Sequence, residues 1–127
     1  MANTYKDLLV WQKAKALAVE IYRATERFPK NEIFGLTSQM RRAAISVASN
    51  IAEGQGRGSK PDFVKFLCVA RGSLLELETQ LEIALELGMG NPDELSKLRE
   101  DCYKTLGSSI ALWAQSKQRR GRSVFQP

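Results

Sequence analysis

The chain contains no histidine and only two cysteines. The lack of histidine excludes Ser-His-Asp and Cys-His nucleophilic sites, imidazole acid–base chemistry and the commonest metal ligand. Cys68 and Cys102 are too few for a disulfide framework or a four-cysteine metal site, so we expect both to be small apolar residues. No apolar run approaches the roughly 20 residues that cross a bilayer, and the first residues form no apolar signal core. We therefore expect a cytoplasmic protein that uses no metal or other cofactor.

Charged residues are unevenly distributed along the 127 residues, although the net charge is only +5. Counting lysine and arginine against aspartate and glutamate, residues 1–36 carry +2, residues 37–71 carry +4 and residues 72–101 carry −6. Residues 102–127 carry +5 and contain no acidic residue. Such blocks favour an anionic partner such as RNA or DNA, or contact between oppositely charged faces of neighbouring copies. Solvated helix faces with a frayed basic tail are the alternative.

Apolar residues recur at helical spacing through almost the whole chain, and no stretch shows the sustained alternation of a strand. The periodicity predicts four helices, separated by breaks near Phe28-Pro29, at Gly54 and near Gly88. The four apolar stripes contain Val10, Ala14, Leu17, Ile21 and Thr25; Leu36, Met40, Ala43, Ala44, Val47 and Ile51; Phe63, Phe66, Leu67, Ala70, Leu74, Leu77, Leu81, Ala84 and Leu85; and Leu95, Leu98, Cys102, Leu106, Ser109, Ile110 and Trp113.

Helix start signals agree with these breaks. Ser59 and Asn91 are typical capping residues ahead of the third and fourth helices, whereas the second helix could begin after Asn31 or after Thr37. Because the connections are short, consecutive helices should run antiparallel. We therefore predict an all-α, up-down-up-down four-helix bundle over residues 1–115 and a basic C-terminal tail over residues 116–127.

Several apolar residues lie outside the core stripes when the helices are drawn at 100° per residue. Their presence on three helices suggests that they form subunit contacts. Wide apolar arcs that are simply buried within one subunit are the alternative. The residues of this predicted oligomer interface are Trp11, Tyr22, Ile45, Cys68, Leu75 and Ile83.

A polar stripe flanks the apolar stripe of the second helix. Serine and asparagine are only moderate helix formers, so their clustering here needs a reason. One interpretation is a shared polar site, and the other is a satisfied hydrogen-bond network between helices or subunits, with Ser73 or Glu76 as partner. The stripe consists of Gln39, Arg42, Ser46, Asn50 and Glu53.

Three glycines fall in the segment 54–60 between the second and third helices. The spacing does not match a P-loop, and the segment follows a helix rather than a strand. We therefore interpret it as a glycine turn. Arg57 and Lys60 lie beside the amino end of the third helix, where they could contact a backbone phosphate.

The ordered motifs of the chain resemble a known family. They are DLLVWQKA at 7–14, GLTSQMRRAA at 35–44, SNIAEG at 49–54 and ARGSLLEL at 70–77. In this order they resemble the 23S rRNA-intervening-sequence protein family, also called the four helix bundle protein family, over about residues 5 to 115. The basic tail is not part of this resemblance.

The resemblance implies a four-helix subunit assembled into a ring-shaped homopentamer. Some members are encoded inside insertions of bacterial large-subunit rRNA genes, and related proteins accompany reverse transcriptases and bind nucleic acid and the polymerase. Most members have no assigned biochemical function. The family's motif residues map to Gln39, Arg42, Asn50, Glu53, Gly54, Arg57, Ser73 and Glu76.

The function that these features favour is non-enzymatic binding of structured RNA or DNA through backbone phosphates, by a basic surface repeated around an oligomer. Base-specific recognition is not expected, because no aromatic platform is visible. The alternative is a protein-interaction scaffold, for example an accessory factor for a reverse transcriptase. An enzyme that uses Arg42, Asn50 and Glu53 would lack an activated nucleophile. The candidate phosphate-binding residues are Arg41, Arg57, Lys60, Lys65, Lys117, Arg119, Arg120 and Arg122.

Overall fold

The computed structural model describes the backbone of residues 4–125 and the side chains of residues 4–109. Four α-helices account for most of this part of the chain: α1 (Leu9–Thr25), α2 (Leu36–Gly56), α3 (Lys60–Glu86) and α4 (Pro92–Phe125). Two short 3-10 helices, η1 (Tyr5–Asp7) and η2 (Lys30–Glu32), precede α1 and α2. Residues 4–125 contain no strand, so the all-α prediction is confirmed.

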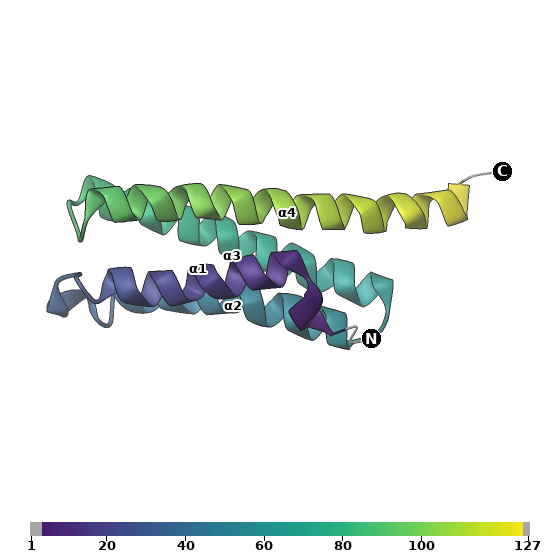
Figure 1. Ribbon diagram of the computed structural model, residues 1–127, viewed down its shortest axis with the longest axis horizontal. Helices are drawn as coiled ribbons and strands as arrows, with labels where there is room; N and C mark the ends of the chain where they lie inside the picture. The colour runs from purple at the N-terminus through teal and green to yellow at the C-terminus, as the bar shows by residue number, and fades with distance from the viewer. Residues whose placement is uncertain (1–3, 126–127) are drawn as a thin grey trace.

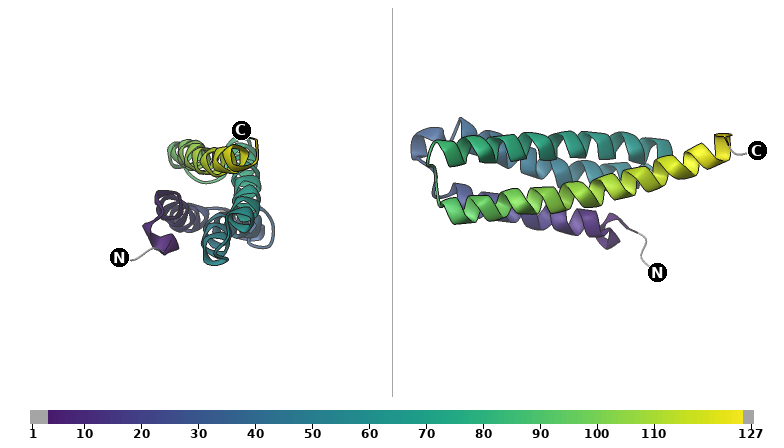
Figure 2. Two further views of the ribbon diagram at one scale, coloured as in Figure 1. Left: turned by 90° about the vertical axis from the view of Figure 1, so that its right-hand side faces the viewer. Right: turned by 90° about the horizontal axis from the view of Figure 1, so that it is seen from above.

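The four helices form an antiparallel bundle (Figure 1). Each helix packs against the next one along the chain, and α4 closes the bundle by packing against α1. The end-on view in Figure 2 shows the helices at the corners of a rough square. The up-down-up-down topology is therefore confirmed for the single chain, whereas the ring assembly stays a prediction.

The predicted apolar stripes meet in one core. Most stripe residues with described side chains are buried, and Leu36, Phe63, Phe66, Leu85 and Leu106 are partly buried at its margin. The side chains of Ile110 and Trp113 lie outside the described residues. The largest fully buried apolar side chains are Ile21, Met40, Val47, Ile51, Leu67, Leu74, Leu77, Leu81, Leu95 and Cys102.

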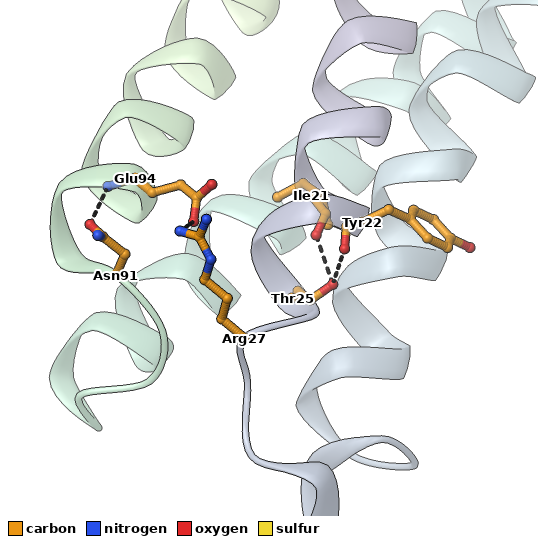
Figure 3. Close-up of polar contacts among 6 residues, drawn as sticks. All are labelled: Ile21, Tyr22, Thr25, Arg27, Asn91 and Glu94. Carbon is orange, nitrogen blue, oxygen red and sulfur yellow. Dashed lines mark hydrogen bonds and ion pairs between the residues drawn. The ribbon is translucent and has the colours of Figure 1, made fainter.

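Helix starts follow the predicted capping signals at α3 and α4. The Ser59 hydroxyl accepts a hydrogen bond from the backbone N–H of Asp62, and the Asn91 side chain accepts one from the N–H of Glu94 (Figure 3). The start of α2 differs from both options considered for it. Gly35 occupies the capping position, and the Glu32 carboxylate accepts the N–H of Leu36 at 3.1 Å. This cap was missed because a glutamate four residues ahead of a helix is no general start signal.

The antiparallel topology brings distant segments of the chain to the same end of the bundle. The start of α1, the α2–α3 connection and the C-terminal part of α4 lie at one end, which we call the α2–α3 end (Figure 1). The α1–α2 and α3–α4 connections lie at the other, the α1–α2 end. In the α2–α3 connection Gly58 has φ of +79°, a backbone conformation that glycine adopts without strain, which confirms the predicted glycine turn.

Candidate functional site

Charge is separated along the length of the bundle. Among the described side chains, the half that contains the α2–α3 end comprises residues 4–16, 47–72 and 106–109, with seven basic and three acidic residues, a net +4. The other half comprises residues 17–46 and 73–105, with eight basic and eleven acidic residues, a net −3. The basic residues of the first half are Lys6, Lys13, Lys15, Arg57, Lys60, Lys65 and Arg71.

Arg57, Lys60 and Lys65 lie together around the α2–α3 connection. Arg57 follows the last residue of α2, forms a 2.9 Å ion pair with Glu53 and lies over the ring of Phe66. Lys60 is the first residue of α3, and Lys65 is exposed little more than a turn later. Neither lysine forms an ion pair with any described residue. An exposed pair such as Arg57–Glu53 contributes only about 0–1 kcal/mol, so a phosphate can compete for Arg57.

Arg41 does not belong to this group, contrary to the sequence-based prediction. It lies in the opposite half, where its Nε donates to the Thr25 hydroxyl at 2.9 Å and its NH2 group donates to the backbone carbonyl of Tyr22. The guanidinium also lies 4.6 Å from the centre of the Tyr22 ring. Figure 3 shows the two acceptors side by side at the end of α1. Arg41 therefore braces α2 against α1.

The predicted basic tail is helical in its backbone, because α4 continues to Phe125. Figure 1 shows this part of α4 extending past the other three helices at the α2–α3 end. The side chains of Lys117, Arg119, Arg120 and Arg122 lie outside the described residues. Their backbone position is the structural feature that associates them with Lys60 and Lys65.

The polar stripe of α2 faces α3, and part of it forms the hydrogen-bond network expected as one of its two interpretations. The hydroxyls of Ser46 and Ser73 lie 2.8 Å apart. Asn50 donates its amide to the carbonyl and the hydroxyl of Ser46, at 2.8 and 2.9 Å. The network thus joins α2 to α3 within one subunit.

The same stripe also borders a hollow of about 380 Å³ between α2 and α3. Glu76 does not bond to Ser46, as the sequence had allowed, but accepts from the Nε2 of Gln80 at 3.3 Å. Gln80 is buried, and the sequence analysis did not identify it. The residues lining the hollow are Gln39, Arg42, Ala43, Ser46, Ser73 and Glu76.

Five of the six predicted interface residues are exposed. Tyr22 and Ile45 border a shallow apolar groove between α1 and α2, which also contains Ala18, Val19 and Ala48. Cys68, Leu75 and Ile83 are exposed on α3. Trp11 differs, because it packs partly buried against the core and its ring meets that of Tyr5 edge to face. Phe34, which is 95% exposed, was not among the predicted residues, because it lies between helices and not on a stripe.

The cysteine and acidic side chains are the candidates for metal or nucleophilic chemistry among the described residues. No group of three or more cysteine, aspartate and glutamate residues there is arranged to hold a metal ion. Burial raises the pKa of the Cys102 thiol to about 12, so this thiol stays protonated at neutral pH and acts as a core residue, as predicted. Cys68 is a free, exposed thiol. In the part of the chain that the structure describes, no helix has the length and apolar character needed to cross a membrane.

The chain matches a protein-family model and solved structures. Residues 6–109 match the family model described as 23S rRNA-intervening sequence protein. Among solved structures, a protein of unknown function from the S23 ribosomal protein family of Bacteroides thetaiotaomicron aligns with a TM-score of 0.74 and 22% identity, covering 83% of this chain and 98% of that chain. At this identity the likeness establishes a shared fold. None of the curated proteins matches the chain.

Proposed function

Since this chain belongs to the family of 23S rRNA-intervening sequence proteins, a name that specifies no biochemical activity, we propose its function from its own surface. The proposed function is non-enzymatic binding of structured RNA or DNA by the α2–α3 end. The observation that carries it is the separation of charge, a net +4 in one half of the described bundle against −3 in the other. A phosphate backbone is the repeated anion that such a surface fits.

Arg57, Lys60 and Lys65 supply the central contacts in this proposal. Lys60 and Lys65 have no ion-pair partner among the described residues, and Arg57 shares its charge with exposed Glu53. The amino end of α3 adds the positive end of a helix dipole beside Lys60, which Asp62 in its first turn partly offsets. The backbone of α4 continues past the other helices at this end and would bring the four basic residues of the tail to the same surface.

Assembly into a homopentameric ring is the second part of the proposal. Its support is the presence of exposed apolar side chains on three helices, among them Tyr22, Ile45, Leu75 and Ile83, each 39–48% exposed. A ring would repeat the basic end in every subunit. Several weak phosphate contacts would then act together on one nucleic acid.

The test is binding of a labelled RNA hairpin and a DNA duplex, measured by fluorescence anisotropy across a salt series. We expect affinity to fall steeply with salt. In the double variant Lys60→Ala/Lys65→Ala, the plot of log affinity against log salt should become less steep, and the magnitude of its slope should decrease by about 2, one for each lost phosphate contact. The matched control Lys30→Ala/Lys97→Ala removes two lysines from the opposite half and should leave the slope unchanged.

Two results would contradict the proposal: no binding of either nucleic acid at low salt, or an equal decrease of the salt slope in both double variants. A protein partner that stays bound to the chain after nuclease treatment would then favour the scaffold alternative.

A further inference from the structure

The hollow between α2 and α3 contains two opposite charges that do not neutralise each other. Arg42 on α2 and Glu76 on α3 both line it and are both exposed. They form no ion pair, and Arg42 has no hydrogen-bond partner among the described residues. A bound molecule could therefore meet a full guanidinium donor set on one side and a carboxylate on the other.

Glu76 is oriented by a buried residue. The side chain of Gln80 is only 5% exposed, and its Nε2 donates to Oε2 of Glu76 at 3.3 Å. Its own Oε1 is buried and has no partner among the described residues. A buried carbonyl without a partner costs free energy, so this glutamine is not explained by core stability. Its one hydrogen bond in the described structure holds the Glu76 carboxylate and leaves Oε1 of Glu76 free to accept.

The two serines that line the hollow, Ser46 and Ser73, include one hydroxyl donor without a partner among the described residues. Asn50 donates to the Ser46 hydroxyl, and the Ser46 and Ser73 hydroxyls share one further hydrogen bond. Two hydroxyl hydrogens are available for that single bond, so one remains without a partner whichever serine donates. Ala43, which also lines the hollow, is small and 4% exposed. Three of the six lining residues, Ala43, Ser46 and Ser73, thus have small side chains.

We propose that this hollow binds a guanine base. Guanine has two adjacent acceptors, O6 and N7, which match the forked donors of Arg42. On its neighbouring edge it has two adjacent donors, N1–H and the 2-amino group, which match the carboxylate of Glu76. Adenine has an amino donor in place of O6 and no hydrogen on N1. Recognition would thus depend on hydrogen bonds to base edges, which the absence of an aromatic platform had led us not to expect.

The guanine could belong to a free nucleotide or to a nucleic-acid strand. The second source rests on the proposed function. Along the helices, Lys65 lies eight residues from Ser73 and Arg57 lies eleven residues from Ser46, about 12 and 16 Å at 1.5 Å per residue. Both are displaced toward the α2–α3 end, so phosphates next to a bound guanine would be directed to the proposed basic surface.

The experiment compares ligands that differ at one base edge. Short single strands of uridine with one central guanine, inosine or adenine are titrated at fixed salt, with GMP, IMP and AMP as free competitors. We expect guanine to bind about 10-fold more tightly than adenine, within the range of one good bidentate contact. Inosine lacks only the 2-amino group and should fall between them. Competition by GMP but not by AMP would show that a free nucleotide is sufficient, and a preference seen in strands alone would identify a strand ligand.

Two surface variants test the residues. Glu76→Gln removes the carboxylate and should reduce the preference for guanine over adenine, because only the contact of Arg42 with O6 and N7 would still distinguish the two bases. Arg42→Ala should weaken the binding of guanine-containing strands about 10-fold. The matched controls Glu86→Gln and Arg23→Ala change exposed residues outside the hollow and should retain the preference. Circular dichroism of each variant checks that the bundle is folded.

The two proposals fail differently. Equal affinity for guanine, inosine and adenine strands, with the Lys60 and Lys65 dependence intact, overturns the guanine site and leaves phosphate binding standing. Binding of GMP without salt-dependent binding of any strand supports the guanine site and contradicts the proposed function. An undiminished preference for guanine in Glu76→Gln would overturn the role of the carboxylate.

Discussion

Gly54 of α2 packs directly against α3, with no room for a side chain. A Cβ added there would lie 2.5 Å from Cβ of Phe66 and 3.3 Å from Cδ1 of Phe63. The sequence pattern predicted that the second helix ends at Gly54. This prediction was wrong, because α2 continues to Gly56 and Gly54 is buried. In a sequence, a glycine that ends a helix cannot be distinguished from a glycine that lets a neighbouring helix pack closely. Only the packing in the folded structure distinguishes them.

We expect Gly54→Ala to destabilise the bundle. The added methyl group meets the Cβ of Phe66, which cannot move without shifting α3, so the cost should be about 1–3 kcal/mol of unfolding free energy. The matched control is Gly72→Ala, an exposed position in the middle of α3 with no atom within 4 Å of the added Cβ. That variant should be stabilised by about 0.5–1 kcal/mol through helix propensity. Urea unfolding followed by circular dichroism measures both, and an unchanged Gly54→Ala midpoint would contradict the close approach.

At the scale of helices, most of the architecture could be predicted because its causes are local. The spacing of apolar residues within each helix fixes which face is buried. The caps at Ser59 and Asn91 each use a side chain three residues from its partner. Arg41 could not be placed this way. Its partner Tyr22 is nineteen residues away, and their contact depends on how α1 and α2 cross.

The brace between α1 and α2 predicts unequal effects at two adjacent arginines. Arg41→Ala removes the bonds to the Thr25 hydroxyl and the Tyr22 carbonyl and should lower the unfolding free energy by about 1–2 kcal/mol. Arg42→Ala removes an exposed side chain with no partner among the described residues and should change it by less than about 0.5 kcal/mol. Thermal or urea unfolding of the pair gives the comparison. Equal losses in both variants would show that Arg41 is an ordinary surface residue.

At the scale of the whole molecule, the candidate site could be predicted only in part. The sequence contains the charge blocks, but folding decides that 47–72 lies beside the start of α1 while 73–105 lies in the opposite half. The polar stripe was visible as a stripe, and its hydrogen bond from Ser46 to Ser73 was among the partners considered. The role of Gln80 was invisible, since burial of one polar residue among leucines depends on three-dimensional packing.

If the predicted interface joins subunits, assembly should be sensitive to a charge placed in it. Tyr22→Glu places a carboxylate in the apolar groove shared with Ile45 and should lower the mass in solution, because an unpaired charge is costly to bury between subunits. Leu87→Glu makes the same kind of change at a 64% exposed residue outside the predicted interface and should leave the mass unchanged. Light scattering measures the mass, and circular dichroism should show similar helix content in both. If Tyr22→Glu has the same mass in solution as the unmodified protein, this groove is not a subunit interface.

The lengthwise separation of charge also governs how the molecule meets a polyanion before any contact forms. Opposite net charges at the two halves make the bundle an elongated dipole, and the field of a nearby phosphate chain exerts a torque on it. The molecule would therefore arrive with the α2–α3 end leading. Phe34 and Leu87, at the trailing end, would then face away from the nucleic acid and stay accessible to another protein.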